Sequence, residues 1–196
     1  WAHRALIFRQ LKDLSDHITV DVGHPDMMAE GWSLSPDFAG ATGDSLFGKT
    51  KLHEIYTKSD PGVSGRVTVP VLWDKKTDSI VSNESSEIIR MFNSAFNGLT
   101  GNIADYWPSE MHAEIEPINA RIYSTFNNGV YKSGFATSQS AYDEAVTDLF
   151  DTMEWLENRL KTDRYLTLTL PTELTPYVDA WLEVWRPILL KIMILG

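Results

Sequence analysis

The chain has 196 residues, of which 43% are hydrophobic and 22% are charged, so it is large enough to bury a substantial core and too apolar to be a disordered chain. Asp and Glu outnumber Lys and Arg by 27 to 17, which gives a formal net charge of −10 at pH 7. Negative charge of this size opposes attraction to nucleic-acid phosphates and to anionic lipid. We expect neither a nucleic acid nor a membrane as a partner.

Composition also limits the chemistry that the chain can perform. The sequence has no cysteine, and no two of its five histidines stand at the i, i+4 spacing of metal ligands on one helix face. The longest apolar run, residues 187–195, is shorter than the about 20 residues that cross a bilayer. We therefore predict no metal site and no membrane-spanning segment.

The first part of the chain predicts a helix, a strand and a long connection. No residue before Trp1 can cap the first helix, predicted over residues 1–14, so we expect a further segment of the natural protein upstream. Residues 18–22 alternate apolar and polar side chains as a half-buried strand does, and the glycine- and proline-rich residues 24–50 predict the connection. The apolar stripe of the helix consists of Leu6, Ile7, Leu11 and Leu14.

A β-hairpin is predicted after the long connection. The β-branched run Val67–Trp73 and the run Ser79–Ser82 flank the polar turn Asp74–Asp78. Pro70 interrupts the first run, and because proline cannot donate a hydrogen bond to a ladder, it fits only at an edge, a bulge or a cis turn. The bond between Val69 and Pro70 is therefore a candidate cis peptide.

The residues after the hairpin have helical periods. Asn83 can cap an amphipathic helix whose apolar positions extend to Phe96. Further helices are predicted over residues 114–126 and 138–161, and Ser138 is among the residues that can cap the second. This order predicts an α/β domain of thioredoxin-like fold followed by an all-α domain.

Four segments of the sequence carry a resemblance to a known family. They are Trp1-Ala-His-Arg4, Ser64-Gly-Arg-Val-Thr-Val-Pro-Val-Leu-Trp-Asp74, Ser82-Asn-Glu-Ser-Ser-Glu-Ile-Ile-Arg90 and Asn127-Asn-Gly-Val-Tyr-Lys-Ser-Gly-Phe-Ala136. Through them the chain resembles the glutathionyl-hydroquinone reductases, the Xi class of the omega-like glutathione S-transferases. The resemblance implies a thioredoxin-like glutathione-binding domain over residues 1–100, without its first strand, and a helical transferase domain over residues 101–196. Residues 167–196 do not match the family pattern.

The resemblance implies a thiol reaction. In the family, Cys-Pro precedes the Trp-Ala-His-Arg motif, so this chain would start two residues after the catalytic cysteine, and no catalytic residue is assigned within it. A thiolate at a helix N-terminus, where the helix dipole lowers its pKa, would attack the sulfur of a glutathionyl-hydroquinone and release the hydroquinone. Glutathione is thus the implied co-substrate, and glutathionylated quinols are the implied substrates.

The resemblance also implies a glutathione site. Val69 would pair its backbone with the cysteinyl part of glutathione. Glu84 would hold the ammonium group of the γ-glutamyl end of glutathione. Ser85, together with the helix N-terminus, would hold the carboxylate of the same end. Arg66 and Trp32 match positions that line the site, and the guanidinium fork of Arg66 suits a carboxylate.

Several of these residues have a structural interpretation as well. Tyr131 matches a tyrosine that faces the hydroquinone, where its hydroxyl would bind the leaving phenolate oxygen, but it can also be a packing residue. Binding and packing are equally supported for Trp32. Arg66 on its own is typical of a surface charge, and Glu84 and Ser85 suit the first turn of any helix.

Two other functions stay open. One is a binding or scaffold module that keeps the tripeptide site and has lost catalysis. The other is an ordinary transferase that activates the thiol of glutathione with a hydroxyl group, which the Trp-Ala-His-Arg start disfavours. The resemblance implies a homodimer, and the thiol chemistry needs a reduced glutathione pool, which implies the cytoplasm, with mitochondria as the alternative.

Overall fold

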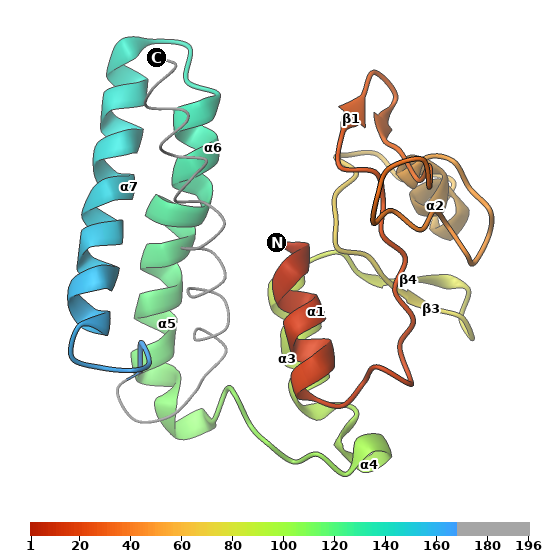
Figure 1. Cartoon of the computed structure of the whole chain (residues 1–196), viewed down its shortest axis with the longest axis horizontal. Coiled ribbons are helices and arrows are strands. Elements are labelled where there is room, and N and C mark those ends of the chain that lie inside the picture. Colours follow the sequence, from red (N-terminus) through yellow and green to blue (C-terminus); the bar gives the residue numbers. More distant parts are fainter. Residues whose placement is uncertain (168–196) are drawn as a thin grey trace. The chain divides into compact units, whose positions relative to one another are not determined.

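The computed structural model describes residues 1–167, and residues 168–196, which include nearly all of the tail that does not match the family pattern, lie outside the described residues. The chain divides into two compact units, Trp1–Ala104 and the residues from Asp105 onward. The elements of Figure 1 are α1 (Ala2–Leu11), β1 (Met27–Met28), β2 (Gly31–Trp32), α2 (Leu52–Ser59), β3 (Leu72–Asp74), β4 (Ser79–Ser82), α3 (Ser85–Ser94), α4 (Asn97–Thr100), η1 (Ser109–Met111), α5 (His112–Arg121), η2 (Ile122–Asn127), α6 (Asn128–Gly134) and α7 (Gln139–Leu160).

Helix α1 packs against α3 through a face that differs from the predicted stripe. Ala5 and Phe8 are buried, whereas Leu6 is 42% exposed. The prediction for Leu6 was wrong because the apolar residues of α1 are spread around the helix, so that only the contact with α3 decides which face is buried. Leu14, which follows the helix, is buried as predicted.

Lys12 closes the end of the same helix. Its side chain is buried, and its ammonium group donates hydrogen bonds to the carbonyl oxygens of Asn102, at 2.9 Å, and of Ala104. A buried ammonium group is stable only where such acceptors replace water. Lys12 therefore ties the last residues of the first unit to α1.

The predicted hairpin is present, but its ladder is shorter than the sequence pattern. Strands β3 and β4 pair antiparallel, with Trp73 opposite Ile80 and a register shift between Leu72 and Trp73. The bond between Val69 and Pro70 is cis, as predicted, and these two residues precede the ladder.

The strand predicted over residues 18–22 is wrong. Within residues 1–167, this segment belongs to no ladder. Instead, the N–H group of Val22 donates to Oγ1 of Thr42, at 2.8 Å, and its carbonyl accepts from the N–H group of Thr42, at 2.9 Å. The alternating pattern describes which side chains are half-buried, but a strand also requires a neighbouring strand to pair with.

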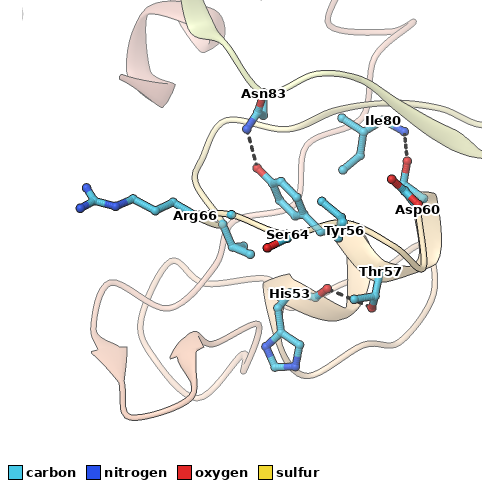
Figure 2. Close-up of a pocket in the computed structure, with 12 residues that line it drawn as sticks. His53, Tyr56, Thr57, Asp60, Ser64, Arg66, Ile80 and Asn83 are labelled. Carbon is cyan, nitrogen blue, oxygen red and sulfur yellow. Dashed lines mark hydrogen bonds between the residues drawn. The ribbon is translucent and has the colours of Figure 1, made fainter.

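Helix α2, which the sequence analysis did not predict, forms the centre of a buried cluster in the first unit. Leu52, Ile55 and Tyr56 are buried at the i, i+3, i+4 spacing of one helix face. Figure 2 shows Tyr56 pointing from α2 towards Asn83. Partly buried hydrophobic residues surround the cluster: Trp32, Leu34, Phe47, Val67, Val71, Trp73 and Ile80.

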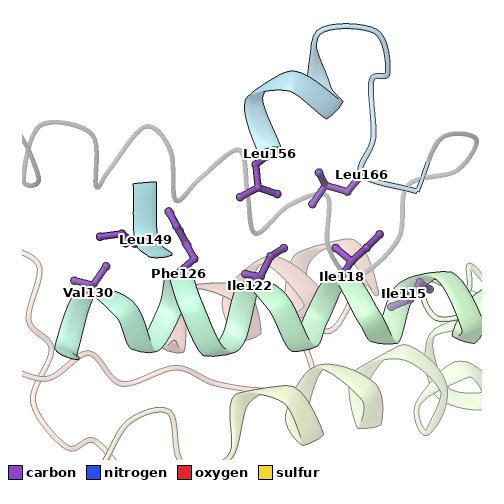
Figure 3. Packing of buried hydrophobic residues seen from close by; sticks show 8 residues of the cluster. All are labelled: Ile115, Ile118, Ile122, Phe126, Val130, Leu149, Leu156 and Leu166. Carbon is purple, nitrogen blue, oxygen red and sulfur yellow. The ribbon is translucent and has the colours of Figure 1, made fainter. Parts of the chain in front are cut away.

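The second unit is helical in its described part, as predicted. Helix α5, the π-helical segment η2 and α6 follow one another without a break, and η2 and α6 pack against α7. Helix α7 is capped by Ser138, whose Oγ accepts a hydrogen bond from the N–H group of Ala141 at 3.3 Å. No helix within residues 1–167 has the length and apolarity that a membrane crossing needs. Figure 3 shows the buried cluster of the second unit, Ile115, Ile118, Ile122, Phe126, Val130, Leu149, Leu156 and Leu166.

Candidate functional site

Glu84 caps the first turn of α3. The prediction that Asn83 caps this helix was wrong. Oε1 of Glu84 accepts hydrogen bonds from the N–H group and from the hydroxyl group of Ser86, both at 3.2 Å. Asn83 does not cap the helix because its amide donates to the hydroxyl of Tyr56, at 3.0 Å, and to Oγ1 of Thr68, at 3.2 Å. A carboxylate therefore stands at the positive end of the helix dipole.

Ser85, the first residue of α3, is 2% exposed and contacts Arg4 of α1. Oγ of Ser85 accepts hydrogen bonds from Nε of Arg4, at 3.0 Å, and from Nη2, at 2.8 Å, since a guanidinium group can only donate. No residue within 1–167 accepts the hydroxyl proton or the main-chain N–H proton of Ser85. Ser85 therefore presents two hydrogen-bond donors at a helix N-terminus, an arrangement that favours an anion.

Glu84 places an acceptor beside these donors. Its side chain is 53% exposed, and Oε2 accepts no hydrogen bond from a described residue. Nη2 of Arg4 lies 3.8 Å from Oε1 of Glu84, so the carboxylate is paired on one side only. An exposed carboxylate next to two free donors suits a ligand that carries an ammonium group and a carboxylate on the same carbon atom.

The loop before β3 carries the next two predicted residues. The main-chain N–H and C=O groups of Val69 bond to no described residue, and its side chain is exposed. Arg66 lines a cavity of about 520 Å³ beside α2, and Figure 2 shows its side chain extending away from the other residues of that cavity. Arg66 has no ion-pair partner within residues 1–167, so its charge is available to an anionic ligand.

Tyr56 joins the two segments that hold these residues. Its hydroxyl donates to the carbonyl oxygen of Thr68, at 2.7 Å, and accepts from the N–H group of Thr68, at 3.2 Å, and from Asn83. Thr68 precedes Val69, and Asn83 precedes Glu84. The loop and the N-terminus of α3 are therefore held together through one buried oxygen atom.

Trp32 and Tyr131 have different surroundings from the other predicted residues. Trp32 is half-buried in β2 and packs against the cluster of Leu52, Ile55 and Tyr56, in agreement with its structural interpretation. Tyr131 belongs to α6 in the second unit, is 42% exposed, and its hydroxyl bonds to no residue among those that the structure describes. The structure thus brings Arg66, Val69, Glu84 and Ser85 onto two hydrogen-bonded segments. The role of Tyr131 stays a prediction.

Two residues of the site were missed by the sequence analysis. Arg4 belongs to a motif that was noticed, but its partner Ser85 lies 81 positions away. Tyr56 belongs to a helix that was not predicted. Within the described part of the chain, no three His, Asp or Glu side chains cluster as metal ligands.

Comparison with known proteins finds similarity to glutathione transferases. Residues 1–95 match the family described as "Glutathione S-transferase, N-terminal domain". The glutathionyl-hydroquinone reductase YqjG of Escherichia coli (strain K12) is 54% identical over 173 residues, which are 88% of this chain and 53% of YqjG. The glutathionyl-hydroquinone reductase PcpF of Sphingobium chlorophenolicum is 49% identical over 166 residues, which are 85% of this chain and 53% of PcpF. The chain spans about half the length of these relatives.

Solved structures agree with these matches. The glutathione-bound structure of YqjG from Escherichia coli K-12 has a TM-score of 0.86 at 53% identity, over 89% of this chain and 57% of that one. The glutathione transferase Xi 1 of Trametes versicolor has a TM-score of 0.86 at 48% identity, over 89% of this chain and 62% of that one. The predicted fold class, a thioredoxin-like transferase domain followed by a helical region, is confirmed. Residues 1–95 therefore match the family of glutathione S-transferase N-terminal domains, and the chain is a homologue of glutathionyl-hydroquinone reductases and resembles Xi-class glutathione transferases in structure.

Proposed function

We propose that these residues bind and orient glutathione in a reductase that removes glutathione from glutathionyl-hydroquinones. The observation that carries the proposal is the exposed carboxylate of Glu84 beside the two unpaired donors of Ser85. The γ-glutamyl end of glutathione has an ammonium group and a carboxylate on one carbon atom, so an acceptor and a pair of donors side by side match it.

Two further groups support the same ligand. Val69 offers a free main-chain N–H and a free C=O group, which can pair with the cysteinyl part of glutathione as one strand pairs with another. Arg66 offers an exposed guanidinium group for the glycyl carboxylate. A local cation is needed because glutathione is an anion and the chain has a formal net charge of −10.

The proposed reaction transfers the glutathionyl group from the ring of the hydroquinone to a cysteine and then to a second glutathione. A cysteine thiolate attacks the sulfur of the glutathionyl-hydroquinone and forms a disulfide bond; the bond from sulfur to the ring breaks, and the ring carbon keeps the electron pair and takes up a proton. The thiolate of a second glutathione then attacks the mixed disulfide, which regenerates the first thiolate and yields glutathione disulfide. The glutathionyl-hydroquinone is reduced to the hydroquinone, and two sulfur atoms, one from its glutathionyl group and one from free glutathione, are oxidised to the disulfide. Residues 1–196 contain no cysteine, so their part is to bind and orient the tripeptide.

The experiment uses the natural full-length protein. Calorimetry with S-methylglutathione, which cannot form a disulfide, measures binding, and chromatography of a reaction with glutathionyl-hydroquinone and glutathione measures turnover. We expect saturable binding and one glutathione disulfide for each hydroquinone released. Binding without turnover supports the binding or scaffold module, and conjugation of chlorodinitrobenzene alone supports an ordinary transferase. No binding contradicts the proposal. The homodimer and the cytoplasmic location stay predictions of the resemblance.

A further inference from the structure

Arg4 and Ser85 are 81 positions apart in the sequence and share two hydrogen bonds. Arg4 stands in the first turn of α1 and Ser85 begins α3, and these two helices pack against each other. The side chain of Arg4 is only 12% exposed, so its guanidinium group is held in place by the protein. This contact belongs to the region that the proposed function assigns to the γ-glutamyl end of glutathione.

The contact determines what the hydroxyl group of Ser85 can do. A serine hydroxyl has two lone pairs and one proton, and a guanidinium group only donates. Nε and Nη2 of Arg4 therefore occupy both lone pairs of Oγ, and the hydroxyl can only donate its proton. Without Arg4 the hydroxyl could rotate and donate to the neighbouring carboxylate of Glu84, or accept a bond from the ammonium group of a ligand.

The charge of Arg4 acts on the same place. A ligand carboxylate that accepts a bond from Ser85 must lie close to Glu84, and two carboxylates repel each other. Nη2 of Arg4 lies 3.8 Å from Oε1 of Glu84 and offsets part of that negative charge. Because the guanidinium group is largely shielded from water, its field is screened less than that of an exposed arginine.

We infer that Arg4 is a positioning residue for the α-carboxylate of the γ-glutamyl end: it holds the hydroxyl of Ser85 as a donor and offsets the charge of Glu84. The inference rests on the proposed glutathione site. Arg4 acts through Ser85 and need not touch the tripeptide itself. Its loss should therefore weaken ligands that have this carboxylate relative to ligands that lack it.

The test compares two ligands of the full-length protein by calorimetry. S-methylglutathione has the α-carboxylate, and its analogue with a 4-aminobutyryl group in place of γ-glutamyl has the ammonium group but lacks the carboxylate. In the wild type, the analogue should bind about tenfold more weakly or worse, since it loses hydrogen bonds to a charged group. The measured quantity is the ratio of the two dissociation constants.

Substitution of Arg4 should bring the ratio of the two dissociation constants close to one. In Arg4→Ala, S-methylglutathione should lose about tenfold in affinity relative to the analogue, so that the ratio approaches one. Arg4→Lys keeps the charge but loses the fork, and should give an intermediate ratio. The matched control is Arg9→Ala on the same helix: Arg9 donates to the carbonyl oxygens of Ser15, at 2.7 Å, and Ile18, and its loss should leave the ratio unchanged.

Where Arg4→Ala does not fold, a double-mutant cycle gives the answer. Arg4→Lys should lower the ratio when residue 85 is serine and have no effect on it in the Ser85→Ala background, because the two residues act as one unit.

Each other outcome has a defined meaning. Equal weakening of both ligands in Arg4→Ala shows a structural contact between the helices and overturns the inference, and so does an unchanged ratio. A wild type that binds both ligands equally also overturns it, while glutathione binding stands. A wild type that binds neither ligand contradicts the proposed function as well.

Discussion

The hydroxyl group of Tyr56 lies 2.7 Å from the carbonyl oxygen of Thr68, and through this bond α2 holds the loop that contains Val69. The same hydroxyl accepts hydrogen bonds from the N–H group of Thr68, at 3.2 Å, and from the amide of Asn83, at 3.0 Å. Because Asn83 precedes Glu84, one oxygen atom supports both segments of the proposed glutathione site.

The substitution Tyr56→Phe tests this support. It leaves the carbonyl of Thr68 without its donor and should lower the free energy of unfolding by about 1–3 kcal/mol. Affinity for S-methylglutathione should fall as well, because the loop and the first turn of α3 lose their common anchor. Urea denaturation and calorimetry measure the two effects. The control is Tyr142→Phe, since the hydroxyl of Tyr142 bonds to no described residue. Full affinity in Tyr56→Phe would show that the site does not depend on this anchor.

The substitution Arg66→Ala tests the proposed contact with the glycyl carboxylate. We expect affinity for S-methylglutathione to fall about tenfold, because a charge-assisted hydrogen bond is lost. The free energy of unfolding should not change, since Arg66 is exposed and pairs with no described residue. The affinity of Arg66→Lys should lie between those of the wild type and Arg66→Ala. The control is Lys75→Ala, which removes an exposed charge in the hairpin turn. Wild-type affinity in Arg66→Ala would remove this residue from the site.

Glu54 should make stability depend on pH. Its carboxylate accepts hydrogen bonds from the N–H groups of Lys51, at 2.9 Å, and Thr50, at 3.0 Å, and these bonds lower the pKa of Glu54 below its ordinary value. A pKa that is lower in the folded state than in the unfolded state means that the charged form stabilises the fold. This contribution is complete above the unfolded pKa and is lost as the pH falls through the folded pKa.

The measurement is the free energy of unfolding of the wild type and of Glu54→Gln, from neutral pH down to a pH below the folded-state pKa of Glu54. The wild type should be more stable than the variant at neutral pH, and the difference should vanish in acid once Glu54 is protonated. Glu154→Gln, at an exposed position of α7, is the control and should show no such convergence. A difference that stays constant with pH would contradict the role given to Glu54.

Substitution of two glycines by alanine should change the free energy of unfolding in opposite directions. A Cβ atom on Gly129 in α6 would lie 3.5 Å from side-chain atoms of Leu149, an ordinary contact, so Gly129→Ala should raise the free energy of unfolding by about 0.5–1 kcal/mol. Gly43 has a φ of +77°, and a Cβ there would lie 3.2 Å from the carbonyl oxygen of Leu34. Gly43→Ala should therefore lower the free energy of unfolding by about 1 kcal/mol or more. Thermal denaturation of both variants checks the signs; destabilisation by Gly129→Ala would contradict the packing of α6 on α7.

The elements that could be predicted from the sequence are those set by local spacing. Helix α7, Gln139–Leu160, matches the predicted residues 138–161, and Ser138 caps it as expected. Helix α3 was also predicted, but its cap is Glu84, because Asn83 is engaged by a tyrosine 27 positions away. Local periodicity identifies a helix, whereas its cap depended here on a distant contact.

The errors concern partners that are distant in the sequence. The segment 18–22 has a strand pattern but no ladder within the described residues. Helix α2 is only eight residues long, which leaves too little periodicity to recognise. The predicted glutathione residues came from resemblance to a family, and Arg4 and Tyr56 were missed because their contacts join separate segments of the chain.

The most direct test of the proposed site is calorimetric titration of the full-length wild type and Glu84→Gln with S-methylglutathione. Glutamine can still cap α3 through its carbonyl oxygen, but it has no charge to hold an ammonium group. We predict that the wild type binds and that Glu84→Gln binds about tenfold more weakly or worse, with little change in the free energy of unfolding. Equal affinity in the two proteins would show that the first turn of α3 does not recognise the γ-glutamyl end, and would contradict the account.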